Sequence, residues 1–214
     1  MGRSQSGVLG NVTGKVGQVV FSSWKGIDTV RAAPRKGNRK LSEKQLAQQE
    51  RFRLVGDFVK MMASLFELTF KDFKGGMTGS NSALGQMITN AVSGDYPDMK
   101  FDYSKASIAQ GRLPIGDALP ATVDPTGLLN FKWTDDSATL IGSAKPDDKA
   151  VLVAWCHETQ QGTYLIGSAK RSDTQATLPV QSLKGKTVHT WLAFVSANNR
   201  HASPSVYTGS ILVP

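Results

Sequence analysis

The sequence has few of the residues that catalysis, metal binding or covalent cross-linking require. Among its 214 residues are one cysteine, Cys156, and three histidines, His157, His189 and His201. A lone cysteine forms no disulfide within its own chain, so no disulfide framework holds this fold. Each histidine stands alone in a different predicted strand or turn, and no Cys/His pair has zinc-site spacing. We therefore expect no metal ion and no cofactor.

Nucleophilic and acid–base signatures are also missing. Cys156 precedes His157 in the apolar run AVLVAWCHE, but neighbouring residues on a strand point to opposite faces, which favours Cys156 as a small buried side chain. The aspartate pairs Asp135–Asp136 and Asp147–Asp148 stand at predicted strand ends, where such residues commonly form turns. There is no G-x-S-x-G elbow. We expect a protein that is not an enzyme.

Long apolar runs are absent. No segment approaches the roughly 18 consecutive apolar residues of a membrane span. The opening residues, MGRSQSGVLGNVTGK, lack the apolar core of a secretory signal. We expect a chain that is cytoplasmic as synthesised, with no membrane partner, unless a virion or other particle incorporates it.

Positive charge, by contrast, is abundant and unevenly placed. The formal net charge is +8. Residues 1–60 hold twelve Lys or Arg and four Asp or Glu, whereas residues 61–214 hold thirteen of each. The whole excess therefore belongs to the front of the chain. Such asymmetry indicates a polyanion or an acidic surface as partner, although a solvated basic surface has the same composition.

The front of the chain reads as a glycine-rich arm followed by a β-hairpin. The stretches GQVVFSSW and IDTVRAA flank Lys25-Gly26, and Gly26 can supply the positive φ of a tight turn. An isolated hairpin is only marginally stable, so it must pack on its own domain or on another subunit. We predict self-association through this assembly arm, whose residues are Gly10, Gly14, Gly17, Val19, Phe21, Trp24 and Gly26.

A basic loop follows the hairpin. Pro34 ends the second strand, and the segment RAAPRKGNRK has five cations and no acid. Cations neutralise phosphates, and an exposed aromatic ring can stack on a base. Phe21 and Trp24 have opposite strand parity, so we expect one of them to face a core. The predicted residues for a polyanion or other partner are Arg31, Arg35, Lys36, Arg39 and Lys40.

Two helices are predicted after this loop. Apolar residues follow helical spacing over residues 43–70, behind a capping-box pattern of Ser42 and Gln45. The segment SNSALGQMITNAVSG predicts a shorter helix that stops at Gly94. The segment FDYSKASIAQGRL, residues 101–113, then reads as a strand.

Short strand-like segments fill the rest of the chain. They are rich in β-branched and aromatic residues and are separated by turn clusters such as KPDDK and ANNRHASP, a pattern typical of an antiparallel immunoglobulin-like or fibronectin type III-like sandwich. Trp133, Trp155 and Trp191 are expected to anchor the core between its two sheets. The segments are LLNFKWTD, ATLIGS, AVLVAWCHE, GTYLIGSA, TQATLPV, TVHTWLAFVSA and SVYTGSILVP.

Together these segments predict an α+β protein in three parts. Residues 1–99 hold the arm, the hairpin, the basic loop and the helices. Residues 100–117 form a connecting strand or linker, and residues 118–214 form the sandwich. Because the sandwich has its own tryptophans, we expect it to fold alone.

Several segments also resemble a large uncharacterised family of Bacteroidota proteins. The resemblance spans nearly the whole chain and implies a helical front, a sandwich at the back and no assigned activity. The chain departs from the family in lacking a proline before Ser42 and in having Gln49 where an arginine is common. The matching segments are LGNVTGKVGQVVFSSWKGIDTVRAAPRK, the spaced residues Ser42, Gln45, Gln48, Arg51 and Phe52, NAVSGDYPDMKFDYSKASIAQGRLP, FKWTD, DDKAVLVAW, ATLPV, VHTWLAFVSA and SVYTGSILV.

The front of the chain has a looser likeness to some phage and prophage virion proteins. The shared order is a glycine-rich start, V-V-x-S, G, V-R, P, S/T-x-x-Q and R-F. A hairpin with a free edge can add strands to a neighbour. Our first hypothesis is a non-enzymatic assembly protein of a phage virion or another particle, with itself or other particle proteins as partners. The alternative is a nucleic-acid-binding protein that uses residues 31–40.

Overall fold

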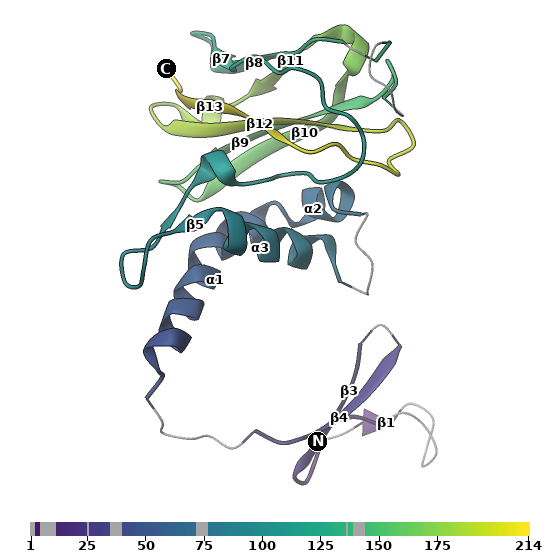
Figure 1. The fold of residues 1–214 in the computed structure, drawn as a ribbon, viewed down its shortest axis with the longest axis vertical. Coiled ribbons are helices and arrows are strands. Elements are labelled where there is room, and N and C mark those ends of the chain that lie inside the picture. Colours follow the sequence, from purple (N-terminus) through teal and green to yellow (C-terminus); the bar gives the residue numbers. More distant parts are fainter. Residues whose placement is uncertain are drawn as a thin grey trace. The chain divides into compact units, whose positions relative to one another are not determined.

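The computed structural model describes residues 3–4, 12–24, 26–34, 40–71, 77–135, 137–138 and 144–214. The chain divides into two compact units, residues 1–42 and residues 43–214, which we call the first and second units (Figure 1). Each unit is described by itself. The described α-helices all belong to the second unit, and antiparallel strands occur in both. The predicted α+β class is confirmed.

A four-stranded antiparallel sheet makes up the described part of the first unit. Gly26 has φ +80° in the turn between the last two strands, which confirms the predicted hairpin. The predicted arm supplies a further paired strand, joined to the hairpin through a turn in which Gly17 has φ +58°. In sheet order, the strands are β1 (Arg3–Ser4), β2 (Val12–Val16), β3 (Val19–Trp24) and β4 (Ile27–Ala32).

The predicted long helix is two helices. They are α1 (Glu43–Met61) and α2 (Ala63–Thr69), separated at Met62, where φ is −99° and ψ is 14°. The break turns the chain within the apolar stripe, so that residues from both helices enter the same hydrophobic core. None of the described helices has both the length and the apolar character needed to cross a membrane.

The third helix, α3 (Gly79–Asn90), begins against α2. Its first two N–H groups, those of Gly79 and Ser80, donate to the Glu67 carboxylate of α2 at 3.2 and 3.1 Å. A carboxylate at a helix start satisfies donors that have no partner within the helix. α3 ends at Asn90, so the predicted stop at Gly94 is wrong.

Gly94 instead lies in the turn of a small two-stranded sheet. This sheet pairs β5 (Val92–Ser93) with β6 (Lys100–Phe101). The predicted strand over residues 101–113 is wrong beyond Phe101, because the chain forms the short 3-10 helix η2 (Tyr103–Lys105) and then an irregular segment. The Asp102 carboxylate accepts hydrogen bonds from the Ser104 N–H and hydroxyl, a local pairing that competes with a sheet ladder.

An antiparallel β-sandwich follows, as predicted. Its three-stranded sheet has the order β11-β8-β7, with β7 (Thr122–Val123), β8 (Leu128–Lys132) and β11 (Gln175–Pro179). Its four-stranded sheet has the order β10-β9-β12-β13, with β9 (Lys149–Cys156), β10 (Gln161–Lys170), β12 (Thr187–Val195) and β13 (Val206–Leu212). The predicted strand ATLIGS lies mostly at residues 139–143, outside the described residues.

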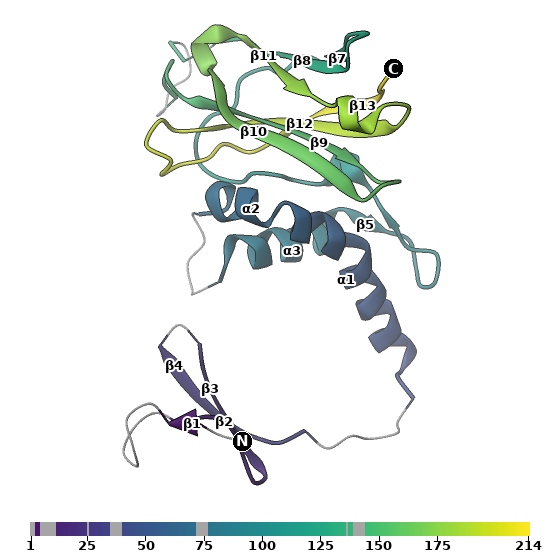
Figure 2. The ribbon, with the colours of Figure 1, turned by 180° about the vertical axis from the view of Figure 1, so that it is seen from behind.

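The four-stranded sheet is the middle of three layers. One of its faces packs against the three-stranded sheet, and the other packs against the helices (Figures 1 and 2). Alternate residues of β9 therefore enter two different cores: Leu152 and Ala154 face the sheet, whereas Val151 and Val153 face the helices. This double burial explains why β9 reads as an unbroken apolar run.

The tryptophans divide between the two cores. Trp133 lies between the sheets, as predicted. Trp155 and Trp191 face the helices instead, and Phe58 of α1 contacts both rings, with centroids 5.1 and 5.7 Å away. The prediction that all three sit between the sheets is therefore wrong for two of them. The helical segment and the sandwich share a core within residues 43–214. The predicted boundaries after residues 99 and 117 stay a prediction about independent folding.

Candidate assembly surface

The strand register sorts the side chains of the first unit onto two faces. Residues that lie opposite each other in an antiparallel pair point to the same side. Gly14 pairs with Phe21, and Phe21 pairs with Val30, which places these three residues in one row. The apolar face, as we call this side, consists of Val12, Gly14, Val16, Val19, Phe21, Ser23, Asp28, Val30 and Ala32.

The apolar face is partly open to solvent, because five of its nine residues are exposed and the other four, Val12, Gly14, Val19 and Phe21, are half-buried. Val16 is 51% exposed and Val30 is 65% exposed. Neither of the two hydrophobic cores in the described chain contains a residue of the first unit. A single sheet layer with one apolar side needs a second layer to be stable in water. The described part of the first unit supplies no such layer.

The opposite side, which we call the cationic face, has a different pattern. Lys15, Val20 and Arg31 form one row across three strands. In the next row, the hydroxyls of Ser22 and Thr29 are hydrogen-bonded at 2.7 Å. Trp24 and Ile27 pair at the hairpin end, 56% and 64% exposed. The cationic face comprises Thr13, Lys15, Val20, Ser22, Trp24, Ile27, Thr29 and Arg31.

The predicted assembly residues divide between these surfaces. Gly14, Val19 and Phe21 lie on the apolar face, whereas Trp24 lies on the cationic face. Phe21 and Trp24 do have opposite parity, as predicted, but neither belongs to a hydrophobic core. Their roles stay predictions. Of the other predicted residues, Gly17 and Gly26 lie in turns, and Gly10 is outside the described residues.

The predicted polyanion-binding residues are only partly described. Arg31 lies on the cationic face, and Lys40 is exposed just before the second unit. Arg35, Lys36 and Arg39 lie outside the described residues. Sequence reasoning did not find Lys15, which β2 brings into the same row as Arg31. The alternation of Thr13, Lys15 and Val16 is compatible with a strand, but the neighbouring glycines favoured the prediction of an irregular arm.

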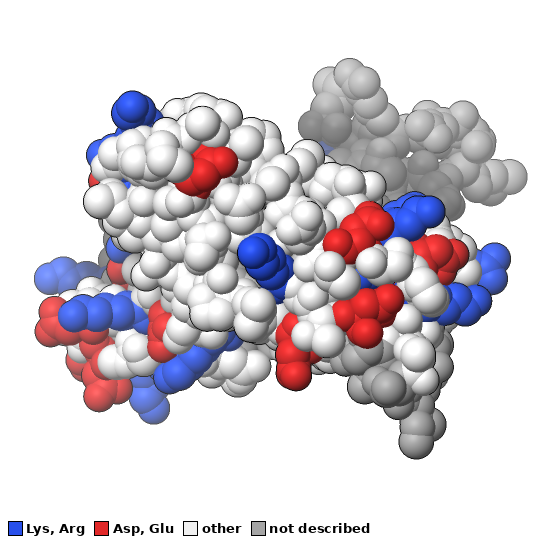
Figure 3. Space-filling view, turned by 90° about the horizontal axis from the view of Figure 1, so that it is seen from above, with Lys and Arg blue, Asp and Glu red and all other residues white. Residues whose placement is uncertain are grey.

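The boundary between the units is also a boundary in charge. Residues 1–42 hold eight Lys or Arg and one Asp, a net of +7, whereas residues 43–214 hold 17 Lys or Arg and 16 Asp or Glu, a net of +1. On the surface seen in Figure 3, Lys and Arg side chains lie next to Asp and Glu side chains in mixed groups. A broad uncharged area lies between these groups. An unbalanced charge is a property of the first unit.

The second unit contains a cluster of histidine and tyrosine side chains that the sequence did not reveal. The Tyr103 hydroxyl and His157 Nδ1 are 2.7 Å apart, and the Tyr103 ring stacks on His189 at 4.2 Å. His189 Nδ1 lies 2.8 Å from the Tyr207 hydroxyl. The expectation that each histidine stands alone is therefore wrong for two of them, because η2 places Tyr103 between the ends of β9 and β12.

Burial shifts the pKa of three side chains near this contact. It raises the pKa of Tyr103 and of Tyr207, and it lowers the pKa of His189. Charge on His157 lowers the pKa of His189 further, whereas Asp102 opposes this effect. A neutral His189 can join a hydrogen bond to Tyr207 without the cost of a half-buried charge. The cluster joins η2 to the sheet, but in the described chain it opens onto none of the hollows found.

One of the predicted aspartate turns contains a buried ion pair. Asp148 and Arg171 are 1% and 0% exposed, and Arg171 Nε lies 3.3 Å from Asp148 Oδ2. The Arg171 guanidinium stacks on Phe194 at 4.0 Å and donates to the Pro114 carbonyl at 2.8 Å. Asp147 is exposed, as a turn residue would be. The pair ties the turn to the sandwich core.

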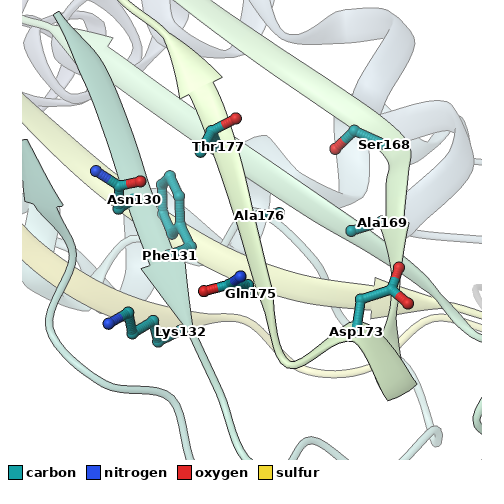
Figure 4. A pocket seen from close by; sticks show the side chains of 9 residues that line it. All are labelled: Asn130, Phe131, Lys132, Ser168, Ala169, Asp173, Gln175, Ala176 and Thr177. Atoms are coloured by element: carbon teal, nitrogen blue, oxygen red, sulfur yellow. The ribbon is translucent and has the colours of Figure 1, made fainter. Parts of the chain in front are cut away.

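A hollow of about 380 Å³ is bordered by strands of both sheets (Figure 4). Asn130, Lys132, Gln175 and Thr177 border it from β8 and β11, and Ser168 from β10. Most of these side chains are exposed and polar, as on an ordinary sheet surface. In the described residues, no group of three or more His, Cys, Asp or Glu side chains is arranged to hold a metal ion.

Cys156 is free and fully buried between the two sheets, as the sequence predicts for a structural cysteine.

Comparison with known proteins gives one match. A model described as a family of unknown function, DUF6266, matches residues 11–209. No curated protein matches the chain, and no solved structure does.

Proposed function

Since the chain belongs to the DUF6266 family of unknown function, we propose a function from geometry: it is a non-enzymatic assembly protein that self-associates through the apolar face of its first unit. The observation that carries the proposal is a sheet whose apolar side chains, Val16 and Val30 among them, lie outside every core of the described chain. The second unit would be the folded body that the assembly displays.

The distribution of charge favours a second copy of the chain as the occupant of this face. Lys15 and Arg31 lie on the cationic face, and Asp28 is the single described charge on the apolar face. When two copies stack through their apolar faces, the cations point away from the interface. Such a pairing is isologous, because each copy contributes the same patch.

The shape of the apolar face also suits stacking on the same face of a second copy. Gly14 lies beside Phe21 in the central row and contributes no side chain. The partner's Phe21 ring can therefore lie over Gly14, so that large and small residues alternate across the interface, as in packed sheets. Two sheets stacked in this way lie about 10 Å apart.

The interface is small, which fits an assembly of many copies better than a tight dimer. Three strands spaced about 4.8 Å apart, with about five residues each, span roughly 14 by 17 Å. Stable partners usually bury about 800 Å² each. We therefore expect weak pairwise association, which additional contacts between pairs in a particle would strengthen. The likeness of the front segment favours a phage virion or a comparable particle as the setting, and the resemblance over nearly the whole chain favours Bacteroidota, with synthesis in the cytoplasm.

The test is the oligomeric state of Val30→Asp beside that of Ile27→Asp. Both residues lie on β4 and are exposed to the same degree, 65% and 64%, but they belong to opposite faces. Light scattering from about 10 µM to about 1 mM covers the range expected for a small interface. We expect the unmodified chain and Ile27→Asp to associate and Val30→Asp to stay monomeric.

Salt gives a second readout of the same proposal. Two copies with a net +7 in their first units repel each other, and added salt screens that repulsion. Self-association should therefore strengthen between about 50 and 500 mM salt. A chain that stays monomeric at all concentrations and salts, or an equal loss of association in both variants, would contradict the proposal.

A further inference from the structure

We infer that the cationic face of the first unit binds single-stranded nucleic acid. The face belongs to an antiparallel sheet, and it combines cations, hydroxyls and an aromatic ring in successive rows. Open sheets that present aromatic rings and cations are a common platform for unpaired bases and their phosphates. This site uses the side of the sheet opposite to the apolar face, so the two surfaces can act at the same time.

The spacing of the rows suits a nucleic-acid strand. Lys15 and Arg31 flank Val20, two strand spacings apart, which is about 10 Å. Trp24 lies four residues along β3 from Val20, or about 14 Å. The cations can therefore contact phosphates while Trp24 stacks on a base further along the strand. The hydroxyls of Ser22 and Thr29 lie in the row between them.

The charge of the unit supports this partner over an uncharged one. Residues 1–42 carry a net +7, and such an excess of positive charge attracts a polyanion. Single strands are favoured over a duplex because an exposed ring stacks on unpaired bases, whereas the bases of a duplex are already stacked. Asp28 is the one described carboxylate of the sheet, and it lies on the other face.

Trp24 provides a direct optical probe of the site. The other three tryptophans, Trp133, Trp155 and Trp191, are 4%, 0% and 0% exposed, whereas Trp24 is 56% exposed. Quenching of tryptophan fluorescence by added oligonucleotide would therefore report contact at Trp24. The probes are fluorescently labelled 15-residue oligo-dT and oligo-U, with binding also followed by anisotropy at about 50 mM salt.

The variant Lys15→Gln/Arg31→Gln removes two cations of the face, those whose side chains the structure describes. Its matched control is Arg112→Gln/Lys184→Gln, which removes two exposed cations that have no ion pair in the described part of the second unit. We expect the first variant to weaken binding at least tenfold. It should also reduce the slope of log K against log salt by about 1.4, or 0.7 for each lost phosphate contact. The control should change neither.

Trp24→Ala separates stacking from charge. It should weaken binding about tenfold and leave the salt slope unchanged, because stacking releases no counterions. The inference would be overturned by any of three results: no binding of either oligonucleotide at about 50 mM salt, equal losses in the two double variants, or equally tight binding of a duplex without quenching of Trp24.

Discussion

Strands β12 and β4 both contain β-branched residues but have opposite surroundings. Seven of the nine residues of β12 are buried, because its sheet is covered on both faces. All six residues of β4 are exposed, although Ile27 and Val30 are typical strand residues. Side-chain type decides that a segment forms a strand, but neighbouring layers decide whether that strand is stable. The second unit contains its own layers, whereas we propose that the first obtains one from another copy.

The largest expected effect comes from removing a layer of the second unit. A fragment of residues 118–214 lacks the helices that cover Trp155 and Trp191. We expect it to bind a dye for exposed apolar surface and to lose cooperative unfolding in urea, whereas residues 43–214 unfold cooperatively. This replaces the sequence-based expectation that the sandwich folds alone. Equal unfolding midpoints for the two fragments would show that the helical layer is dispensable.

The next effect concerns the buried ion pair. Asp148→Ala removes a buried carboxylate that contacts the buried Arg171 guanidinium. We expect a loss of about 3–5 kcal/mol in the free energy of unfolding, measured in urea. Asp147→Ala, at the exposed neighbour, should change it by less than about 0.5 kcal/mol. A small effect at Asp148 would mean that the turn is not tied to the core through this pair.

The smallest effect is a dependence on pH in the histidine–tyrosine cluster. The pKa of His189 is lower in the folded chain than in the unfolded chain, where it is about 6.5. The unfolded state therefore binds more protons as the pH falls below about 6.5, and stability decreases by at most about 1.4 kcal/mol per pH unit for this one group. Above that pH, His189 is neutral in both states and no longer changes the free energy of unfolding as the pH rises.

His189→Gln should flatten this part of the profile, because glutamine does not titrate but can still hydrogen-bond Tyr207. Urea unfolding between about pH 5 and pH 7.5 covers the window set by the lowered pKa. An unchanged profile in His189→Gln would mean that His189 is not the source of the pH dependence.

Sequence patterns predicted the elements whose cause is local. The hairpin at Gly26 needed only a residue that tolerates positive φ, and the sandwich strands followed from their composition. The errors had two causes, a local hydrogen-bond pattern and the contacts between distant segments. The Asp102 hydrogen bonds ended the strand predicted from residue 101, and Trp155 and Trp191 were assigned to the wrong core because alternation does not say which face meets which layer.

The same limit applies to the candidate sites. Strand parity separates Phe21 from Trp24, so the two faces of the hairpin could be derived from the sequence. Lys15 could not be placed beside Arg31 without the register of β2. Likewise, the meeting of His157 and His189 around Tyr103 depends on segments more than 30 residues apart in the chain.

Cross-linking between copies tests the central proposal most directly. Val30→Cys and Ile27→Cys place a thiol on the apolar and cationic faces of the same strand, and native Cys156 is buried and should not react. A bismaleimide of about 10 Å matches the separation of stacked sheets. We predict a covalent dimer with Val30→Cys and none with Ile27→Cys or the unmodified chain. Dimers in equal yield from both variants, or from neither at a concentration where the unmodified chain associates, would contradict assembly through the apolar face.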